Sequence, residues 1–122
     1  LLTWVAASSD VAAAAALDAR FGEVIAASRG AFSWRITVPA DGRLSCDGVL
    51  PTLIQWNDDA HPCDGLPDAG CQLRELDLRH PEAARLERLF ASLQVQGPVV
   101  LRQGDAALAA RIGTPRGVVE LA

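Results

Sequence analysis

The sequence contains no lysine, no tyrosine and no methionine, and aromatic residues make up only 5% of it. Without lysine and tyrosine, the chain itself has no side chain for Schiff-base chemistry, no P-loop lysine and no phenolic general acid. The Gly-x-Ser-x-Gly, Cys-x-x-Cys and glycine-rich phosphate-binding motifs are also missing. The common nucleophile, dithiol and nucleotide sites are therefore excluded within this chain.

Long apolar runs and basic clusters are missing as well. No stretch approaches the roughly 20 apolar residues that span a bilayer, and the apolar start has no basic flank of the signal-peptide kind. All eleven basic residues are arginine, and the net charge is −4 without a basic stripe. We therefore expect a cytoplasmic protein with no membrane partner and no nucleic-acid partner.

What is present suits a compact domain, because 122 residues, 50% of them hydrophobic, can bury a real core. The use of arginine alone, together with the alanine and glycine content, suggests a GC-rich bacterial genome. Because the sequence starts at Leu1 and has no methionine, we expect it to be a fragment of a longer chain.

The three cysteines are an odd number, which fits reduced thiols. His61, Cys63 and Cys71 lie close in sequence and suggest zinc. A fourth ligand would have to be an aspartate: Asp58, Asp59 or Asp64. The spacing matches no common zinc pattern, so we favour a linker loop with small buried thiols.

The most informative stretch is the apolar run 49–56, which is rich in β-formers and lies between two turn sequences. This pattern predicts a buried strand in which only Gln55 needs a hydrogen-bond partner or an open cavity. The stretch 117–121 has the same design. Aligning Gln55 with Glu120 also aligns Leu53 with Val118 and Ile54 with Val119.

The residues before each of these strands also correspond. In the first half we predict a strand at 2–8, a helix capped by Asp10 that ends before Gly22, and strands at 23–28 and 32–38. In the second half we predict a strand at 73–78, a helix opened by His80-Pro81, and strands at 99–102 and 107–112. The predicted fold is α+β, with two tandem βαβββ modules at 1–56 and 71–122 joined by a linker at 57–70.

A paired βαβββ chain resembles the vicinal oxygen chelate superfamily, which includes glyoxalase I, extradiol dioxygenases and bleomycin-resistance proteins. Local motifs resemble the glyoxalase-like domain family within it, over almost the full length. These motifs are Leu1-Leu2-Thr3-Trp4, Asp10-Val11, Leu50-Pro51-Thr52-Leu53-Ile54-Gln55-Trp56, His61-Pro62, Gly70-Cys71-Gln72-Leu73, His80-Pro81 and Thr114-Pro115-Arg116-Gly117. Members usually carry a further N-terminal module, which is absent from this sequence.

The resemblance implies a cup-shaped sheet whose metal ligands come from the first and last strands of each module. The matching positions are Thr3, Gln55, Leu73 and Glu120. Only Glu120 is a good ligand for a divalent metal, whereas a catalytic site needs about three protein ligands. We therefore expect no complete metal site within this chain alone; a partner chain or a further module would have to supply histidine.

The resemblance also implies that the concave face binds a small molecule. The candidate substrate-binding residues are Thr3, Arg35, Gln55, Glu75, Asp77 and Glu120. Glu75 and Glu120 are the candidate catalytic groups. Glu75 and Asp77 could form an acid/base pair with one raised pKa, or could be ordinary solvated carboxylates. Arg35 could bind an anion, or could pair with Glu75 or Glu120. His61 and His80 are expected to have structural roles.

Two functions remain open. One is binding or processing of a small metabolite in the concave sheet, with the reaction undefined. The other is non-catalytic: a ligand-sequestering or dimerisation module, with a homodimer as the partner. If the modules are equivalent, Gln55 and Glu120 point to the same sheet face, and Arg35 or Arg111 lies near Glu120. Replacing Glu120 by glutamine should then cost little stability if the carboxylate is solvated.

Overall fold

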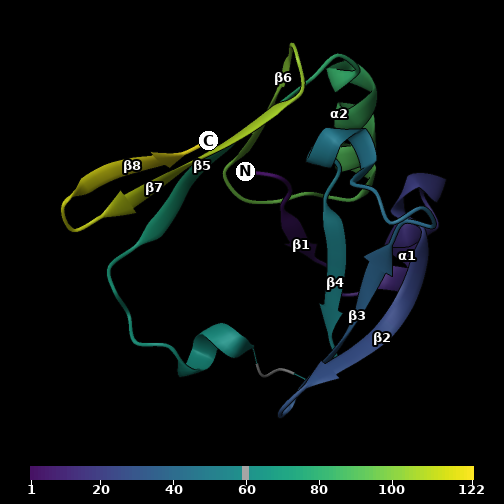
Figure 1. Ribbon diagram of the computed structural model, residues 1–122, viewed down its shortest axis with the longest axis horizontal. Helices are drawn as coiled ribbons and strands as arrows, with labels where there is room; N and C mark the ends of the chain where they lie inside the picture. Colours follow the sequence, from purple (N-terminus) through teal and green to yellow (C-terminus); the bar gives the residue numbers. More distant parts are fainter. Residues whose placement is uncertain (59–60) are drawn as a thin grey trace.

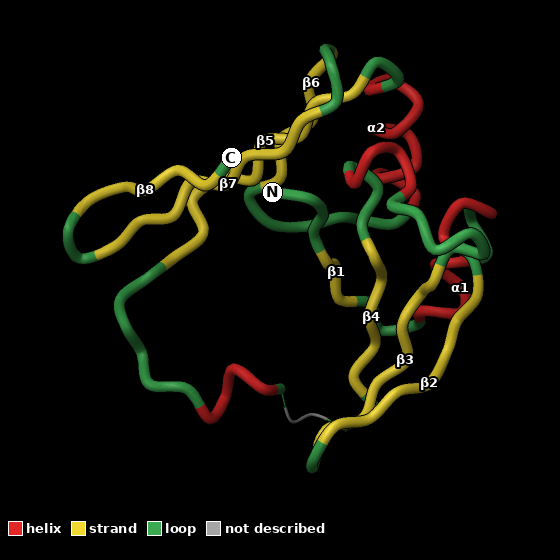
Figure 2. Tube along the Cα trace, in the orientation of Figure 1, coloured by secondary structure: helices red, strands yellow, loops and turns green. Residues whose placement is uncertain are grey.

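The computed structural model describes residues 1–58 and 61–122, and it contains two four-stranded mixed sheets (Figures 1 and 2). The first sheet has the order β1 (Val5–Ala7), β4 (Thr52–Trp56), β3 (Phe32–Val38), β2 (Glu23–Arg29). The second sheet has the order β6 (Val99–Gln103), β5 (Gln72–His80), β7 (Ala107–Thr114), β8 (Gly117–Leu121). The helices are α1 (Val11–Ala15) and α2 (Ala83–Ser92). The predicted α+β fold with two tandem βαβββ modules is confirmed.

The first helix begins where we predicted but ends earlier. Asp10 caps it by accepting a hydrogen bond from the backbone N–H of Ala13 at 3.0 Å. The prediction that it continues to Phe21 is wrong, because Asp18 caps a separate 3₁₀ turn, Ala19–Phe21, by accepting from the N–H of Arg20. An aspartate side chain that bonds the backbone two residues ahead competes with helix continuation.

The strand β4, the last of the first module, begins at Thr52 and is shorter than predicted. Val49 and Leu50 are buried but lie before the strand, directly after a turn. That turn is a 3₁₀ segment, Ser45–Gly48, in which Cys46 and Asp47 both have positive φ. Gly48 ends it with φ +87, and a Cβ there would lie 1.8 Å from the carbonyl oxygen of Leu2. Only glycine allows the chain to pass this closely beneath the N-terminal segment.

The two modules share the order of their elements but not the order of their strands. In the first sheet, the last strand of the module, β4, lies beside the first strand, β1, in a parallel pair. In the second sheet, β5 lies between β6 and β7, and the last strand, β8, is at the edge. The structural positions of Gln55 on β4 and Glu120 on β8 are therefore not equivalent.

Both modules contribute to one apolar core. From the first come Val11, Phe21, Val49, Leu50 and Leu53, and from the second come Leu76, Leu78, Leu86, Phe90, Leu108 and Ala110. Trp4 joins them: its ring meets that of Phe90 edge-to-face with centroids 5.9 Å apart, and its Nε1–H donates to the carbonyl of Val49 at 2.8 Å. Three residues at helical spacing on α2, Ala83, Leu86 and Phe90, are buried in this core.

His80, which we expected to open this helix, is the last residue of β5 and is buried. Its Nδ1 accepts a hydrogen bond from the backbone N–H of Glu82 at 3.0 Å, so it does support the helix start. Among the described residues, no helix is long and apolar enough to cross a bilayer.

We predict that Leu78→Ala destabilises the protein by about 2–5 kcal/mol, because Leu78 is 0% exposed and its removal leaves a cavity between β5 and α2. Urea denaturation followed by far-UV circular dichroism measures the change. The matched control is Val118→Ala, at a position 67% exposed, where a change within about 0.5 kcal/mol is expected. An equal loss in both variants would contradict the assignment of the core.

Candidate functional site

The first sheet has a face covered by α1 and an opposite face that no described helix covers (Figure 1). The helix packs across β2, β3 and β4, on the side of Leu53 and Gln55. The opposite face is mostly apolar, and we name its apolar part the apolar open face: Val5, Ala7, Ile25, Ala27, Phe32, Trp34, Ile36, Val38, Ile54 and Trp56. Three polar residues, Glu23, Arg29 and Thr52, share this face at its margins. Its side chains alternate with those that contact the helix.

An aromatic group forms the end of this face near the linker. The ring centroid of Trp56 lies 5.3 Å from that of Trp34, 6.3 Å from that of Phe32 and 5.2 Å from that of His61. Toward the free edges of the sheet, Val5 is 55% exposed and Ile25 is 43% exposed. Between these edges the apolar side chains of β3 and β4 are half-buried. Contiguous apolar surface that remains accessible to solvent is characteristic of interaction sites.

Apolar and polar residues alternate along 32–38 in the sequence, and this segment forms the strand β3. What the sequence did not indicate is which set of side chains would face the helix. The covered face holds Arg35, Thr37 and Gln55, and the more apolar set lies on the open face, half-buried at Phe32, Trp34 and Ile36 and exposed at Val38. The polar covered residues are satisfied internally: the hydroxyl of Thr37, for example, accepts from the N–H of Leu53 at 2.9 Å.

On the second sheet, five charged side chains form a group that we name the charged cluster: Glu75, Asp77, Arg79, Arg102 and Arg111. They lie on the sheet face opposite α2, because Glu75 and Asp77 alternate along β5 with the buried Leu76 and Leu78. Arg111 Nη2 lies 2.5 Å from Glu75 Oε1, and Arg79 Nη2 lies 3.2 Å from Asp77 Oδ2. Arg102 bridges the two carboxylates: its Nη1 donates a hydrogen bond to Asp77, and its Nη2 lies 3.6 Å from Glu75 Oε1.

The electrostatics of the charged cluster argue against an acid/base pair. Partial burial raises the pKa of Asp77, but hydrogen bonds from Arg102 and Arg79 outweigh this effect and leave the pKa below its ordinary value. Asp77 is thus an ionised hydrogen-bond acceptor at neutral pH. The neighbouring carboxylate therefore does not raise the pKa of Asp77, because arginines lie between the two carboxylates.

Glu120 lies on the exposed edge strand β8, directly opposite Arg111 in the register of β7 and β8. The expectation that Arg35 or Arg111 lies near it is confirmed for Arg111, although the hydrogen bond that Arg111 makes goes to Glu75. Glu120 therefore belongs to the same sheet face as the charged cluster and is solvated.

Gln55 has a different environment, inside the first module. Its Oε1 accepts two hydrogen bonds at 2.9 Å, one from the backbone N–H of Val11 and one from Arg35 Nη2. Val11 is the first residue of α1, so Gln55 caps the helix from the neighbouring strand. Arg35 therefore pairs with the amide of Gln55. The alternative pairing with Glu75 or Glu120 is not observed among the described residues.

The prediction that Gln55 and Glu120 share a face is wrong. Gln55 points to the helix of its module, whereas Glu120 lies with Arg111 on the face turned away from α2. The alignment that selected both residues therefore does not describe equivalent structural positions. Glu75, Asp77 and Glu120 lie on one face of the second sheet, and Arg35 meets Gln55 in the first module. The role of these residues in binding a substrate stays a prediction.

Thr3 is separate from both the charged cluster and the Arg35–Gln55 pair. It lines a small hollow of about 210 Å³ beside Phe21, Thr37 and Leu50. The four positions that correspond to superfamily metal ligands do not fit a metal: Gln55 is engaged by two donors, Leu73 has no donor atom, and Glu120 is at a solvated edge. Among the described residues, no three His, Cys, Asp or Glu side chains are grouped so that they could hold a metal ion.

The suggested zinc residues have other surroundings. His61 caps a 3₁₀ turn, Pro62–Gly65, because its Nδ1 accepts from the N–H of Cys63 while its own N–H donates to Asp64. This is the structural role we favoured. Cys63 and Cys71 are exposed, so the expectation of buried thiols is wrong for both. Asp59 lies outside the described residues.

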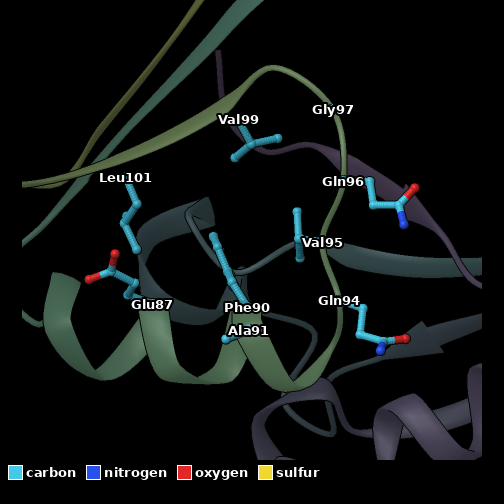
Figure 3. Close-up of a pocket in the computed structure, with 9 residues that line it drawn as sticks. All are labelled: Glu87, Phe90, Ala91, Gln94, Val95, Gln96, Gly97, Val99 and Leu101. Carbon is cyan, nitrogen blue, oxygen red and sulfur yellow. The ribbon is translucent and has the colours of Figure 1, made fainter.

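Two hollows lie near the end of α2, one between the two modules and one within the second module. The larger, of about 560 Å³, runs beside β1 and is lined by Trp4, Leu53, Leu73 and Leu76 among others. The second, of about 480 Å³, is drawn in Figure 3, where Phe90, Val95 and Val99 turn toward the same space. None of the six predicted substrate-binding residues lines either hollow.

Comparison with known proteins adds one finding. The family model described as the glyoxalase-like domain matches residues 1–94, which include the first sheet, β5 and α2. The strands β6, β7 and β8 lie beyond the matched residues. No curated protein and no solved structure matches the chain.

We predict that Gln55→Met lowers the free energy of unfolding by about 1–3 kcal/mol, because it leaves the N–H of Val11 and the Arg35 guanidinium without their common acceptor. Thermal and urea unfolding measure the loss. The matched control is Gln72→Met, since Gln72 is exposed near the start of β5. A Gln55 variant as stable as this control would contradict the capping role.

We also predict a pH dependence from Asp77. Because its pKa is lowered in the folded protein, its contribution is complete above the ordinary aspartate pKa of about 3.9 and is lost as the pH falls through the folded value. Wild-type stability should therefore fall with acidification more steeply than that of Asp77→Asn. Urea unfolding between about pH 5 and pH 2 tests this. Asp105→Asn, in an exposed turn, should keep the wild-type slope; equal slopes in all three proteins would refute the prediction.

Proposed function

Because the chain belongs to the glyoxalase-like domain family, we propose that it has this family's general role of binding or processing a small molecule. The ligand that we propose is flat and apolar, and it binds on the apolar open face. The observation that carries the proposal is the orientation of the first sheet. Its polar residues Arg35, Thr37 and Gln55 lie on the face that α1 covers, whereas its aromatic residues and most of its aliphatic residues lie half-buried or exposed on the open face.

The shape and chemistry of this face favour a ligand with a ring system. Trp34 and Trp56 lie side by side on neighbouring strands, and Phe32 and His61 meet Trp56 edge-on. Aromatic side chains in such a group offer both ring faces and ring edges to a planar guest, which adds to the gain from burying apolar area.

The charged cluster supports binding without chemistry, the second of the two functions left open by the sequence. Glu75 and Asp77, the candidate proton-transfer pair, are both held by arginines, and Asp77 has a lowered pKa. A general base works best with a pKa near the working pH. A ligand-sequestering protein therefore suits this geometry better than an enzyme that uses these carboxylates.

We predict that 1-naphthol, an uncharged two-ring probe, binds saturably to the protein, and that Trp34→Gln weakens this binding about tenfold. This change corresponds to about 1.4 kcal/mol, which is the size of an aromatic contact together with its buried area. Isothermal titration calorimetry measures both affinities.

The matched control is Val118→Gln, which replaces an exposed apolar residue of the second sheet and should leave the affinity unchanged. Circular dichroism and urea unfolding confirm that each variant is folded before titration. Absence of saturable binding to wild type, or equal weakening by Val118→Gln, would refute the proposed site.

A further inference from the structure

The edge strand β8 is exposed along its whole length and on both faces. Val118 is 67% exposed, Val119 is 48% exposed and Leu121 is 45% exposed. The strand pairs only with β7, and Figure 1 shows the β7–β8 hairpin extending away from both helices. Aliphatic residues on both sides of a solvated strand leave apolar surface and a free backbone edge together.

The free edge presents backbone groups in a regular pattern. A two-residue loop, Pro115-Arg116, joins the strands, and Thr114 lies opposite Gly117. The residues that flank a two-residue hairpin loop form a hydrogen-bonded pair. Residues 117, 119 and 121 therefore turn their backbone groups toward β7, and the N–H and C=O groups of Val118 and Glu120 point outward. Edges of this kind are usually protected by charged side chains, above all lysine, or by proline or a bulge. In β8, Glu120 is the one charged residue, and there is no lysine, proline or bulge.

We propose that a second copy of this chain pairs its β8 antiparallel to the first, centred on Val119, so that the two second sheets become one continuous sheet. In this register, Val118 lies opposite Glu120 of the second copy, and their outward backbone groups form the hydrogen-bonded pairs. Val119 lies opposite Val119 of the second copy in the pair without hydrogen bonds, where side chains are closest.

The side chains make this pairing self-complementary. Leu73, Ile112 and Val119 lie in one row across β5, β7 and β8, and the twofold axis joins this row to its own copy. The result is an unbroken aliphatic row across the interface. Cross-strand pairs of β-branched residues are among the favourable ones in sheets.

The charges agree with a second copy as the occupant. Glu120 has Arg111 as its neighbour on β7, and on the new side it faces Val118 of the second copy. No two like charges lie directly opposite each other, which would be destabilising. A different partner strand with a charged residue at its central position would place that charge directly opposite the apolar Val119.

Sedimentation velocity of the whole chain tests the proposal. Wild type should form a dimer that dissociates on dilution, and Val119→Lys should raise the dissociation constant at least about a hundredfold, because two ammonium groups would meet at the twofold axis. The matched control is Ile25→Lys, in the middle of the other sheet's edge strand at similar exposure, 43%, and it should leave the dimer intact. A wild-type monomer at all concentrations, or equal dissociation in both variants, would overturn the proposal.

A cross-linking experiment tests the register independently. In a Cys63→Ser, Cys71→Ser background, which removes the exposed thiols, Val119→Cys should form a disulfide-linked dimer on mild oxidation. Val118→Cys should not, because it lies opposite Glu120 of the second copy. Faster cross-linking of Val118→Cys would exclude the register centred on Val119. Neither experiment depends on the ligand site of the first sheet.

Discussion

The structure of the first module depends on the amide of Gln55. Its Oε1 accepts from the first N–H of α1 and from Arg35 on β3, so one oxygen ties the helix to two strands. An N–H at a helix start has no partner within the helix, and a half-buried guanidinium needs an acceptor. Both needs are met on the same side of the sheet, and this decides which face α1 covers.

The consequence for function is that the other face remains open. A strand with strict alternation must turn one set of side chains toward the helix. Here the set that includes Arg35 and Thr37 is internal, because its polar groups find partners there, and the set that includes Trp34 and Ile36 is external. Apolar surface is left in contact with water, which is costly unless a ligand or a partner covers it.

In the second module, the distribution of polar and apolar side chains over the two sheet faces is the opposite. Its aliphatic residues Leu76 and Leu78 face α2, and its open face carries the charged cluster, in which three arginines neutralise two carboxylates. The strand order differs as well, and β8 lies at an edge instead of beside the first strand of its module. Two segments that are similar in sequence therefore have different environments.

The sequence by itself determined the succession of strands and helices, the buried stripe of α2 and the cap at Asp10, because these follow from local periodicity and from hydrogen bonds between near neighbours. It also determined the alternation along β3. Only the tertiary structure decided which face of each sheet is covered, that the last strands of the two modules pair differently, and that Arg35 binds Gln55 while Arg111 binds Glu75. These outcomes depend on contacts between residues far apart in the chain. A period of two specifies that two faces exist, and long-range packing selects the one that is buried.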